Sequence, residues 1–202
     1  MAIKFQYNKT SLQQVEKQLK VRVRALPTIK NKESALRMEV KKSKDEARNL
    51  ETALERQIAE YENMFALWSE FDPSLIRVKD VELSVKKIAG VRVPVLAQIQ
   101  FDVKPFSLFS APKWYADGLE VLRNLAKTGI ELEFTGLKLN LLEHARKKTT
   151  QKVNLFEKVQ IPGYQDAIRK IKRFMEDEEN LSKSSQKIMR SQQEKRREDT
   201  AW

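Results

Sequence analysis

Cysteine is absent from this chain of 202 residues, and glycine and proline are scarce, with five and six copies. Without cysteine there can be no disulfide framework, no thiolate nucleophile and no cysteine-ligated metal. Few helix-breaking residues combined with 33% charged side chains are typical of long, exposed helices rather than of an ordinary globular core. The absence of cysteine is also compatible with a reducing compartment.

Long apolar runs are missing as well. No stretch approaches the roughly 20 apolar residues needed to span a bilayer. The opening residues, MAIKFQYNKTSLQQ, contain no apolar core of signal-peptide length. We therefore expect a protein that is soluble or that reaches a membrane only through partners.

Reactive constellations are missing too. The chain has no glycine-rich phosphate loop, no dinucleotide-binding G-x-G-x-x-G and no G-x-S-x-G around a serine. Its one histidine, His144, stands among charged residues without a spaced set of metal ligands. We predict that the chain is not itself an enzyme and has no catalytic residue, no cofactor and no metal site.

Positive charge is unevenly distributed. Residues 1–50 carry 13 Lys and Arg against 5 Asp and Glu, and so hold most of the net charge of +11. Such a field can attract nucleic acid, anionic lipid or an acidic protein surface, or it can simply be the solvated face of a helix. Aromatic residues hardly interleave with the basic ones, and no DNA-binding motif accompanies them. We do not expect nucleic acid as a partner, although a basic coiled-coil adaptor that binds nucleic acid or another protein remains the alternative.

A seven-residue repeat runs through the first third of the chain. Its two columns, mostly apolar, are Leu12, Leu19, Leu26, Glu33, Val40, Ala47, Leu54, Tyr61 and Trp68, and Val15, Arg22, Ile29, Leu36, Ser43, Leu50, Gln57 and Met64. A repeat sustained this long predicts a coiled-coil seam. Pro27 lies inside the pattern without changing its phase, and predicts a kink.

A short β-patterned stretch, VELSVKKIAGVRVPVLAQIQF at residues 81–101, interrupts the helical pattern. Valine and leucine alternate with polar residues on either side of Gly90, which predicts a two-stranded hairpin. A hairpin alone is marginal in water, so it must lean on the helices or on another protein chain. Residues 102–118 are expected to form a connecting loop, with an unusual apolar load from Phe106, Leu108, Phe109, Trp114 and Tyr115.

The last third returns to helical spacing. We expect a short helix over residues 119–127 ending at Thr128-Gly129, a second long arm over residues 137–197, and a kink or short break at Pro162-Gly163. The predicted fold is mainly α: a long antiparallel two-stranded coiled coil with a small β-hairpin insertion. Its segments are an N-terminal coiled-coil helix (1–72), the hairpin and connecting loop (73–118), and C-terminal helices that complete the coiled coil (119–202).

Three blocks of sequence carry a resemblance to a known family. They are YNKTSLQQVEKQLK at residues 7–20, KKIAGVRVPVL at residues 86–96, and RKKTTQKVNLFEKVQIPGYQDAIRKIKRFMEDEEN at residues 146–180. In this order they resemble the D subunits of V-type ATP synthases, over nearly the whole chain.

The resemblance implies a non-catalytic rotor shaft in the central stalk. Such a shaft transmits torque between ATP synthesis or hydrolysis in a ring of A and B subunits and ion transport, such as proton transport, in the membrane ring. Its implied partners are the A, B and F subunits and a coupling protein on the membrane side. Its implied location is cytoplasmic, peripheral on the inner face of the membrane through the complex.

Two sets of residues are the expected partner-binding sites. The hairpin is expected to act as a lateral docking element through Ile88, Ala89, Gly90, Val91, Val93 and Pro94. The basic first third is expected to run against acidic loops of the ring, through Lys17, Lys20, Arg22 and Arg24.

Overall fold

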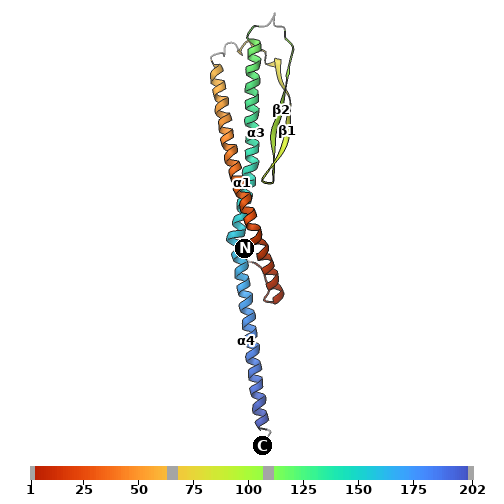
Figure 1. Ribbon diagram of the computed structural model, residues 1–202, viewed down its shortest axis with the longest axis vertical. Helices are drawn as coiled ribbons and strands as arrows, with labels where there is room; N and C mark the ends of the chain where they lie inside the picture. The colour runs from red at the N-terminus through yellow and green to blue at the C-terminus, as the bar shows by residue number, and fades with distance from the viewer. Residues whose placement is uncertain (1–2, 63–67, 107–111, 200–202) are drawn as a thin grey trace. The chain divides into compact units, whose positions relative to one another are not determined.

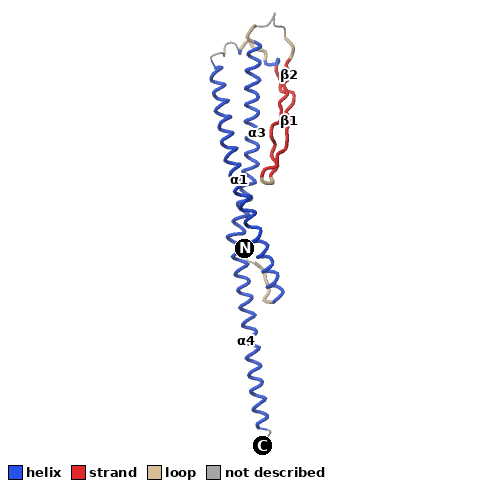
Figure 2. Tube along the Cα trace, viewed as in Figure 1, coloured by secondary structure: helices blue, strands red, loops and turns tan. Residues whose placement is uncertain are grey.

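The computed structural model describes residues 3–62, 68–106 and 112–199. Its helices are α1 (Lys9–Glu62), α3 (Tyr115–Asn154) and α4 (Ile161–Asp199), with a π-helical segment η2 (Leu155–Gln160) between the last two. A short 3-10 turn, η1 (Pro73–Leu75), leads into strands β1 (Ile76–Ile88) and β2 (Val91–Val103). Figures 1 and 2 trace this order, in which the two strands form one antiparallel hairpin. No helix of the described ranges is both long enough and apolar enough to cross a membrane.

The predicted fold class is confirmed: the chain is mainly helical, with helices paired antiparallel and a single hairpin. It divides into two compact units. We call residues 31–149 the hairpin unit; it holds the second half of α1, the hairpin and α3. We call residues 1–30 with 150–202 the terminal unit; it holds the start of α1, η2 and α4. The three-segment division at residues 72 and 118 stays a prediction.

The predicted seam of α1 is confirmed. Every described member of the two heptad columns from Leu12 to Tyr61 is buried or half-buried, while most of the remaining positions are exposed. The helix continues through Pro27, whose missing N–H removes one hydrogen bond from the helix. The kink expected there stays a prediction.

The C-terminal arm starts earlier than the sequence suggested. The expected loop up to residue 118, the stop at Thr128-Gly129 and the arm starting at 137 are wrong, because α3 is one helix from Tyr115. A glycine inside a helix costs only about 1 kcal/mol relative to alanine. Packing of the half-buried Leu122, Leu125 and Ile130 along the same helix offsets that cost.

Pro162 and Gly163 do not break the helix either. Both lie in the first turn of α4, directly after the π-helical η2. A proline inside an α-helix clashes with the carbonyl four residues earlier, and a π-helical turn is wider than an α-helical one. The irregularity that the sequence placed at Pro162 is therefore taken up by the six residues before it.

The hairpin is fixed to its helices at both ends. Near the turn, Val93 of β2 packs with Leu36 and Val40 of α1 and Leu142 of α3, and Val93, Leu36 and Leu142 have no exposed surface. At the open end, a second cluster gathers around Phe71, Leu75 and Leu119, which lie near the start of β1 and of α3. Of the two supports expected for the hairpin, the helices or another protein chain, the structure shows the helices.

The aromatic residues after the hairpin belong to this second cluster. Phe106, Trp114 and Tyr115 pack against it, and the Tyr115 hydroxyl donates a 2.6 Å hydrogen bond to the carbonyl of Glu70. The apolar load that the sequence showed here is therefore core, as far as it is described. Leu108 and Phe109 lie outside the described residues.

Candidate interaction surfaces

The predicted hairpin set lies around the turn, and most of its side chains face the chain's own helices. Val93 is fully buried, and Ile88, Ala89 and Val91 pack around the same cluster. Gly90 alone in the set is exposed. Ala89 and Gly90 have φ angles of 47° and 82°, a left-handed turn that favours glycine. The partner role of this set stays a prediction, and Val93 could meet a partner only if the turn left its helices.

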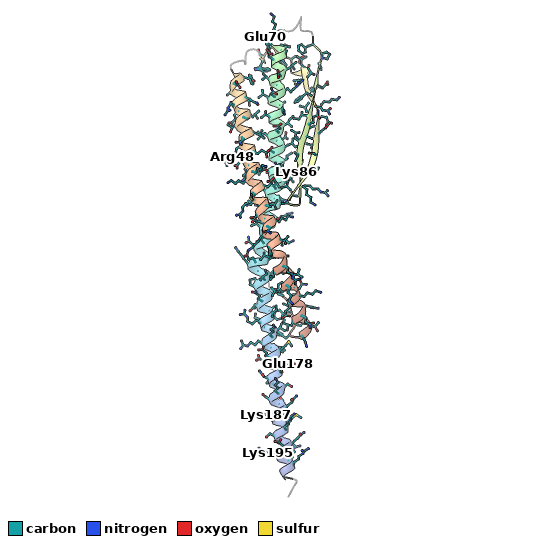
Figure 3. All side chains as sticks on the ribbon, in the orientation of Figure 1. Arg48, Glu70, Lys86, Glu178, Lys187 and Lys195 are labelled. Carbon is teal, nitrogen blue, oxygen red and sulfur yellow. The ribbon has the colours of Figure 1, made fainter. Side chains whose placement is uncertain are left out.

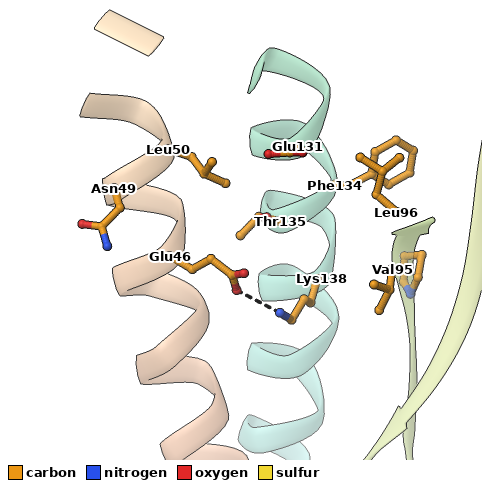
Figure 4. Close-up of a pocket in the computed structure, with 10 residues that line it drawn as sticks. Glu46, Asn49, Leu50, Val95, Leu96, Glu131, Phe134, Thr135 and Lys138 are labelled. Atoms are coloured by element: carbon orange, nitrogen blue, oxygen red, sulfur yellow. Dashed lines mark hydrogen bonds and ion pairs between the residues drawn. The ribbon is translucent and has the colours of Figure 1, made fainter. Parts of the chain in front are cut away.

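An open cavity of about 360 Å³ lies beneath the middle of the hairpin (Figure 4). It is lined by Pro94, Val95 and Leu96 of β2 and by residues of α1 and α3, namely Glu46, Asn49, Leu50, Glu131, Phe134, Thr135 and Lys138. An ion pair between Lys138 Nζ and Glu46 Oε2, 3.0 Å long, joins the two helices at its wall. The hairpin is thus packed at its ends, and an open cavity lies between part of its middle and the helices.

Three large apolar side chains of β1 are exposed, namely Val78, Leu83 and Val85, and we call the surface around Leu83 and Val85 the outer part of the hairpin. Leu83 is 50% exposed and Val85 71% exposed, and their cross-strand partners are Leu96 and Pro94. Lys86 and Lys87 follow directly and are also exposed. Sequence reasoning missed Leu83 and Val85 as surface residues. Their alternation with polar residues marked a strand, but it did not say which face the helices would cover.

The structure brings together three of the four residues of the predicted basic set, on one face of α1. Lys17, Lys20 and Arg24 are exposed on α1, next to the exposed Val21. Arg22 instead lies against the other helix. Its Nε donates a 2.7 Å hydrogen bond to Gln160 Oε1, and its guanidinium carbon is 4.7 Å from the centre of the Tyr164 ring. Arg22 therefore stabilises the terminal unit, whereas the other three can meet a partner.

Ion pairs tie the paired helices together in each unit. In the hairpin unit, Lys44 Nζ lies 2.9 Å from Glu143 Oε1, and the hydrogen bond from Lys44 lowers the pKa of Glu143 below its ordinary value. In the terminal unit, Lys30 pairs with Glu157 of η2 at 2.7 Å. All four side chains are more than a third exposed, so each pair sets the register of the helices more than it adds stability.

Metal and catalytic sites were not expected, and the described residues offer no group of three or more His, Cys, Asp or Glu that could hold a metal. His144 is exposed on α3. Among the described residues, the outer part of the hairpin and the exposed basic residues of α1 are surfaces that a partner could reach.

Comparison with known proteins points to one family. The family model for the ATP synthase D subunit matches residues 11–191. The chain is 31% identical over 191 residues to the V-type ATP synthase D subunit of Borreliella burgdorferi, which covers 93% of this chain and 94% of that protein. It is 26% identical over 186 residues to the protein of the same name from Chlamydia pneumoniae, covering 88% and 87%. The corresponding protein of Chlamydia trachomatis serovar L2 is 28% identical over 183 residues, covering 88% and 90%.

Proposed function

Because the chain belongs to the family of ATP synthase D subunits, we propose that it is the non-catalytic rotor component of the central stalk of a V-type ATP synthase. In this role it transmits torque between ATP chemistry in the ring of A and B subunits and ion translocation in the membrane. It lies on the cytoplasmic side and reaches the membrane through the complex.

The seam of α1 is the observation that carries this proposal. Two columns of buried or half-buried side chains run from Leu12 to Tyr61, first against α4 and η2 and then against α3. Two helices that are packed along their length resist twisting better than one helix, because turning one must drag the other. Ion pairs between the helices, such as Lys44–Glu143 and Lys30–Glu157, oppose sliding along the seam.

The outer faces suit a shaft that turns inside a ring. A bearing surface needs to lack deep anchors, and the exposed positions of α1 are mostly charged or polar. Lys17, Lys20 and Arg24 form the part of the basic set that remains free to face acidic loops of the A and B subunits. We assign these three residues to that contact, without Arg22.

Rotation can be tested directly, because the chain has no cysteine of its own. A single Lys87→Cys variant would carry a bead on the exposed part of the hairpin, in a complex immobilised through its A and B subunits. The bead should turn in one direction when ATP is added. A matched complex with the bead on an immobilised ring component should show no rotation. A complex that hydrolyses ATP while the bead on Lys87→Cys stays still would contradict the rotor proposal.

The F subunit is assigned to the outer part of the hairpin around Leu83 and Val85. These side chains are exposed and apolar beside lysines, and they can be changed without disturbing the buried cluster of Val93. The double variant Leu83→Asp, Val85→Asp should lose a one-to-one complex with the F subunit in size-exclusion chromatography with light scattering. Met38→Asp, at an exposed apolar position of α1, is the matched control and should keep it. If the double variant forms this complex as the wild type does, the hairpin is not the docking site.

A further inference from the structure

Another cavity of the hairpin unit, of about 540 Å³, opens between the end of α1 and the start of α3. Its described lining is mostly apolar and consists of Glu55, Ile58, Ala59, Tyr61, Trp68, Leu122 and Leu125. Ile58 is 55% exposed, although its side chain is large and apolar. Among the described residues, no side chain of the hairpin lines this cavity. The two helices are therefore open to solvent on a face that the hairpin does not cover.

This open face is the one that carries the ion pair between Lys44 and Glu143. Two heptads along each antiparallel helix from that pair bring Ile58 of α1 level with Gly129 of α3. Figure 3 shows Arg48, on the same part of α1, pointing away from the hairpin. The open face and the hairpin thus lie on different sides of the helix pair.

Along α3 the cavity continues as a groove, because two positions on this face have no side chain. Leu125, Gly129, Leu132 and Gly136 follow one another at intervals of four, three and four, and so share one face of the helix. A Cβ atom at either glycine would have no neighbour within 4 Å. The two leucines are only half-buried. From Leu122 to Gly136 the groove is about 21 Å long, which is about four turns of a helix.

Three exposed carboxylates border this groove, Glu51 and Glu55 on α1 and Glu133 on α3. Glu55 lines the cavity itself, and Glu51 precedes it by one turn. Glu133 stands between Gly129 and Gly136. Within the described part of the chain, none of the three carboxylates forms an ion pair. Their charges are therefore available to a partner.

The basic side chains at this level of the helices lie on the hairpin side. Arg123 and Lys127 of α3 line a cavity beneath β2. Arg56 of α1 stands seven residues after Asn49, which lines the cavity of Figure 4. Arg48 precedes the acidic stretch of α1 and marks its lower end. The groove is thus an apolar surface with an acidic border, in a chain whose net charge is +11.

We propose that this groove binds an amphipathic helix of another protein, with its apolar stripe on Gly129 and Gly136 and its lysine or arginine residues beside the acidic border. A helix fits because bare glycine backbone lets another backbone come close. It would cover the half-buried seam here, as β2 covers the seam near the hairpin turn. Basic residues fit because an acidic helix would set like charges against each other. This docking is independent of the rotor proposal, and either can fail without the other.

Two labelled helical peptides of about 18 residues, added to the full chain, test the docking by fluorescence anisotropy. Both carry leucine and alanine at intervals of three and four; one flanks this stripe with lysine and the other with glutamate. The lysine peptide should bind with a dissociation constant in the micromolar range. The glutamate peptide should bind at least about tenfold more weakly, because its charges repel the border. Equal affinity of the two peptides, or no binding of the lysine peptide, would overturn the proposal.

Filling the groove tests the location. Gly129→Leu with Gly136→Leu places two side chains where the docked helix would lie, and should weaken the lysine peptide about tenfold or more. The variant should fold at least as well as the wild type, since leucine favours a helix more than glycine does, and urea unfolding checks this. Ser184→Leu, at an exposed position of α4, is the matched control and should bind as the wild type does. Unchanged affinity in the filled groove would contradict the docking.

Charge reversal tests the acidic border. The triple variant Glu51→Lys, Glu55→Lys and Glu133→Lys should reverse the preference, so that the glutamate peptide binds more tightly than the lysine peptide. The matched control makes the same charge change on exposed positions of α4, with Glu176→Lys, Glu178→Lys and Glu194→Lys. It should keep the preference of the wild type, and circular dichroism checks that both variants keep their helical content. If the two triple variants behave alike, the attraction is general to the chain and the proposal is wrong.

Discussion

In the hairpin unit a strand lies over the packed faces of two helices, whereas in the terminal unit α1 and α4 pack on each other with only Phe5 and Tyr7 of the preceding segment beside them among the described residues. With the strand in place, Leu36, Leu142 and Val93 lose all exposed surface. In the terminal unit only Val15, Ala167 and Ile171 are buried among the described residues, and the apolar side chains packed around them, such as Leu12 and Ile168, are only half-buried. A helix pair therefore buries little core until a third element closes one side.

The irregular backbone also lies in the terminal unit, which has the smaller core. Pro27 lies in the part of α1 that belongs to the terminal unit, and the π-helical η2 is in the same unit. Arg22 and Lys30, on either side of Pro27, both contact η2 through Gln160 and Glu157. Few buried contacts and interrupted hydrogen bonding lower the free energy of local opening. We expect the terminal unit to open first, with faster hydrogen exchange in α4 than in α3.

The largest expected effect comes from disrupting the contact between strand β2 and the helices. Val93→Asp puts a carboxylate into a site without exposed surface, packed by Leu36, Val40 and Leu142, and should lower the free energy of unfolding by more than about 4 kcal/mol. Urea unfolding followed by far-UV circular dichroism measures the loss, and hydrogen exchange should show β2 losing protection. Val85→Asp, on the same hairpin but 71% exposed, is the control and should change stability by less than about 0.5 kcal/mol. Equal losses in the two variants would contradict the packing of the turn.

Matched truncations compare the two cores. Leu142→Ala in the hairpin unit and Ile171→Ala in the terminal unit both shorten side chains without exposed surface. We expect the free energy of unfolding to fall by about 3–5 kcal/mol for Leu142→Ala and by about 2–3 kcal/mol for Ile171→Ala. The second loss is smaller because a site between two helices collapses or admits water more readily than a site closed on three sides. Urea unfolding with hydrogen exchange resolved by unit measures both values. The reverse order would show that the hairpin adds little to the core it covers.

Arg22 provides a smaller test, confined to the terminal unit. Arg22→Ala removes the hydrogen bond to Gln160 and the contact with the Tyr164 ring, and should lower the free energy of unfolding by about 1–2 kcal/mol. Lys20→Ala, two residues earlier and exposed, should cost close to nothing. Thermal unfolding of both variants, together with hydrogen exchange in α4, measures the loss of stability in each. If Lys20→Ala costs as much as Arg22→Ala, the inward position of Arg22 carries no special weight.

The smallest effect is electrostatic. Lys44 lowers the pKa of Glu143 in the folded hairpin unit, so the pair adds stability above the ordinary pKa of 4.5, and this is lost as pH falls through the lower folded value. Because Glu143 is 38% exposed, screening keeps the contribution below about 0.5 kcal/mol. Comparing urea midpoints of the wild type and Glu143→Gln between pH 7 and pH 3 measures it. The wild type should lose more stability than the variant over that range, and identical pH dependence would contradict the pair.

Much of this architecture could be predicted from the sequence because burial along a helix pair imposes a seven-residue repeat. The columns through Leu12 and Val15 marked the seam, and the alternation around Gly90 marked the hairpin. Other features depend on tertiary contacts that no local pattern encodes. Val85 and Val93 are both valines in alternating strands, yet one is exposed and the other buried. Arg22 is basic like its neighbours but turns to the ring of Tyr164, far away in sequence. The glycines of α3 suggested breaks that packing overrides.

The hairpin is held against the helices at both of its ends, and an open cavity lies beneath its middle. The contacts that hold it are the clusters at Val93 and at Phe71, and the part between them lies over the cavity beneath Val95 and Leu96. A sideways push on a free hairpin would simply swing it about its base. Here the same push, applied near Val85, must bend the hairpin and strain both of the clusters that hold it. A force on a few residues of one strand is thereby delivered at two separated points along α3.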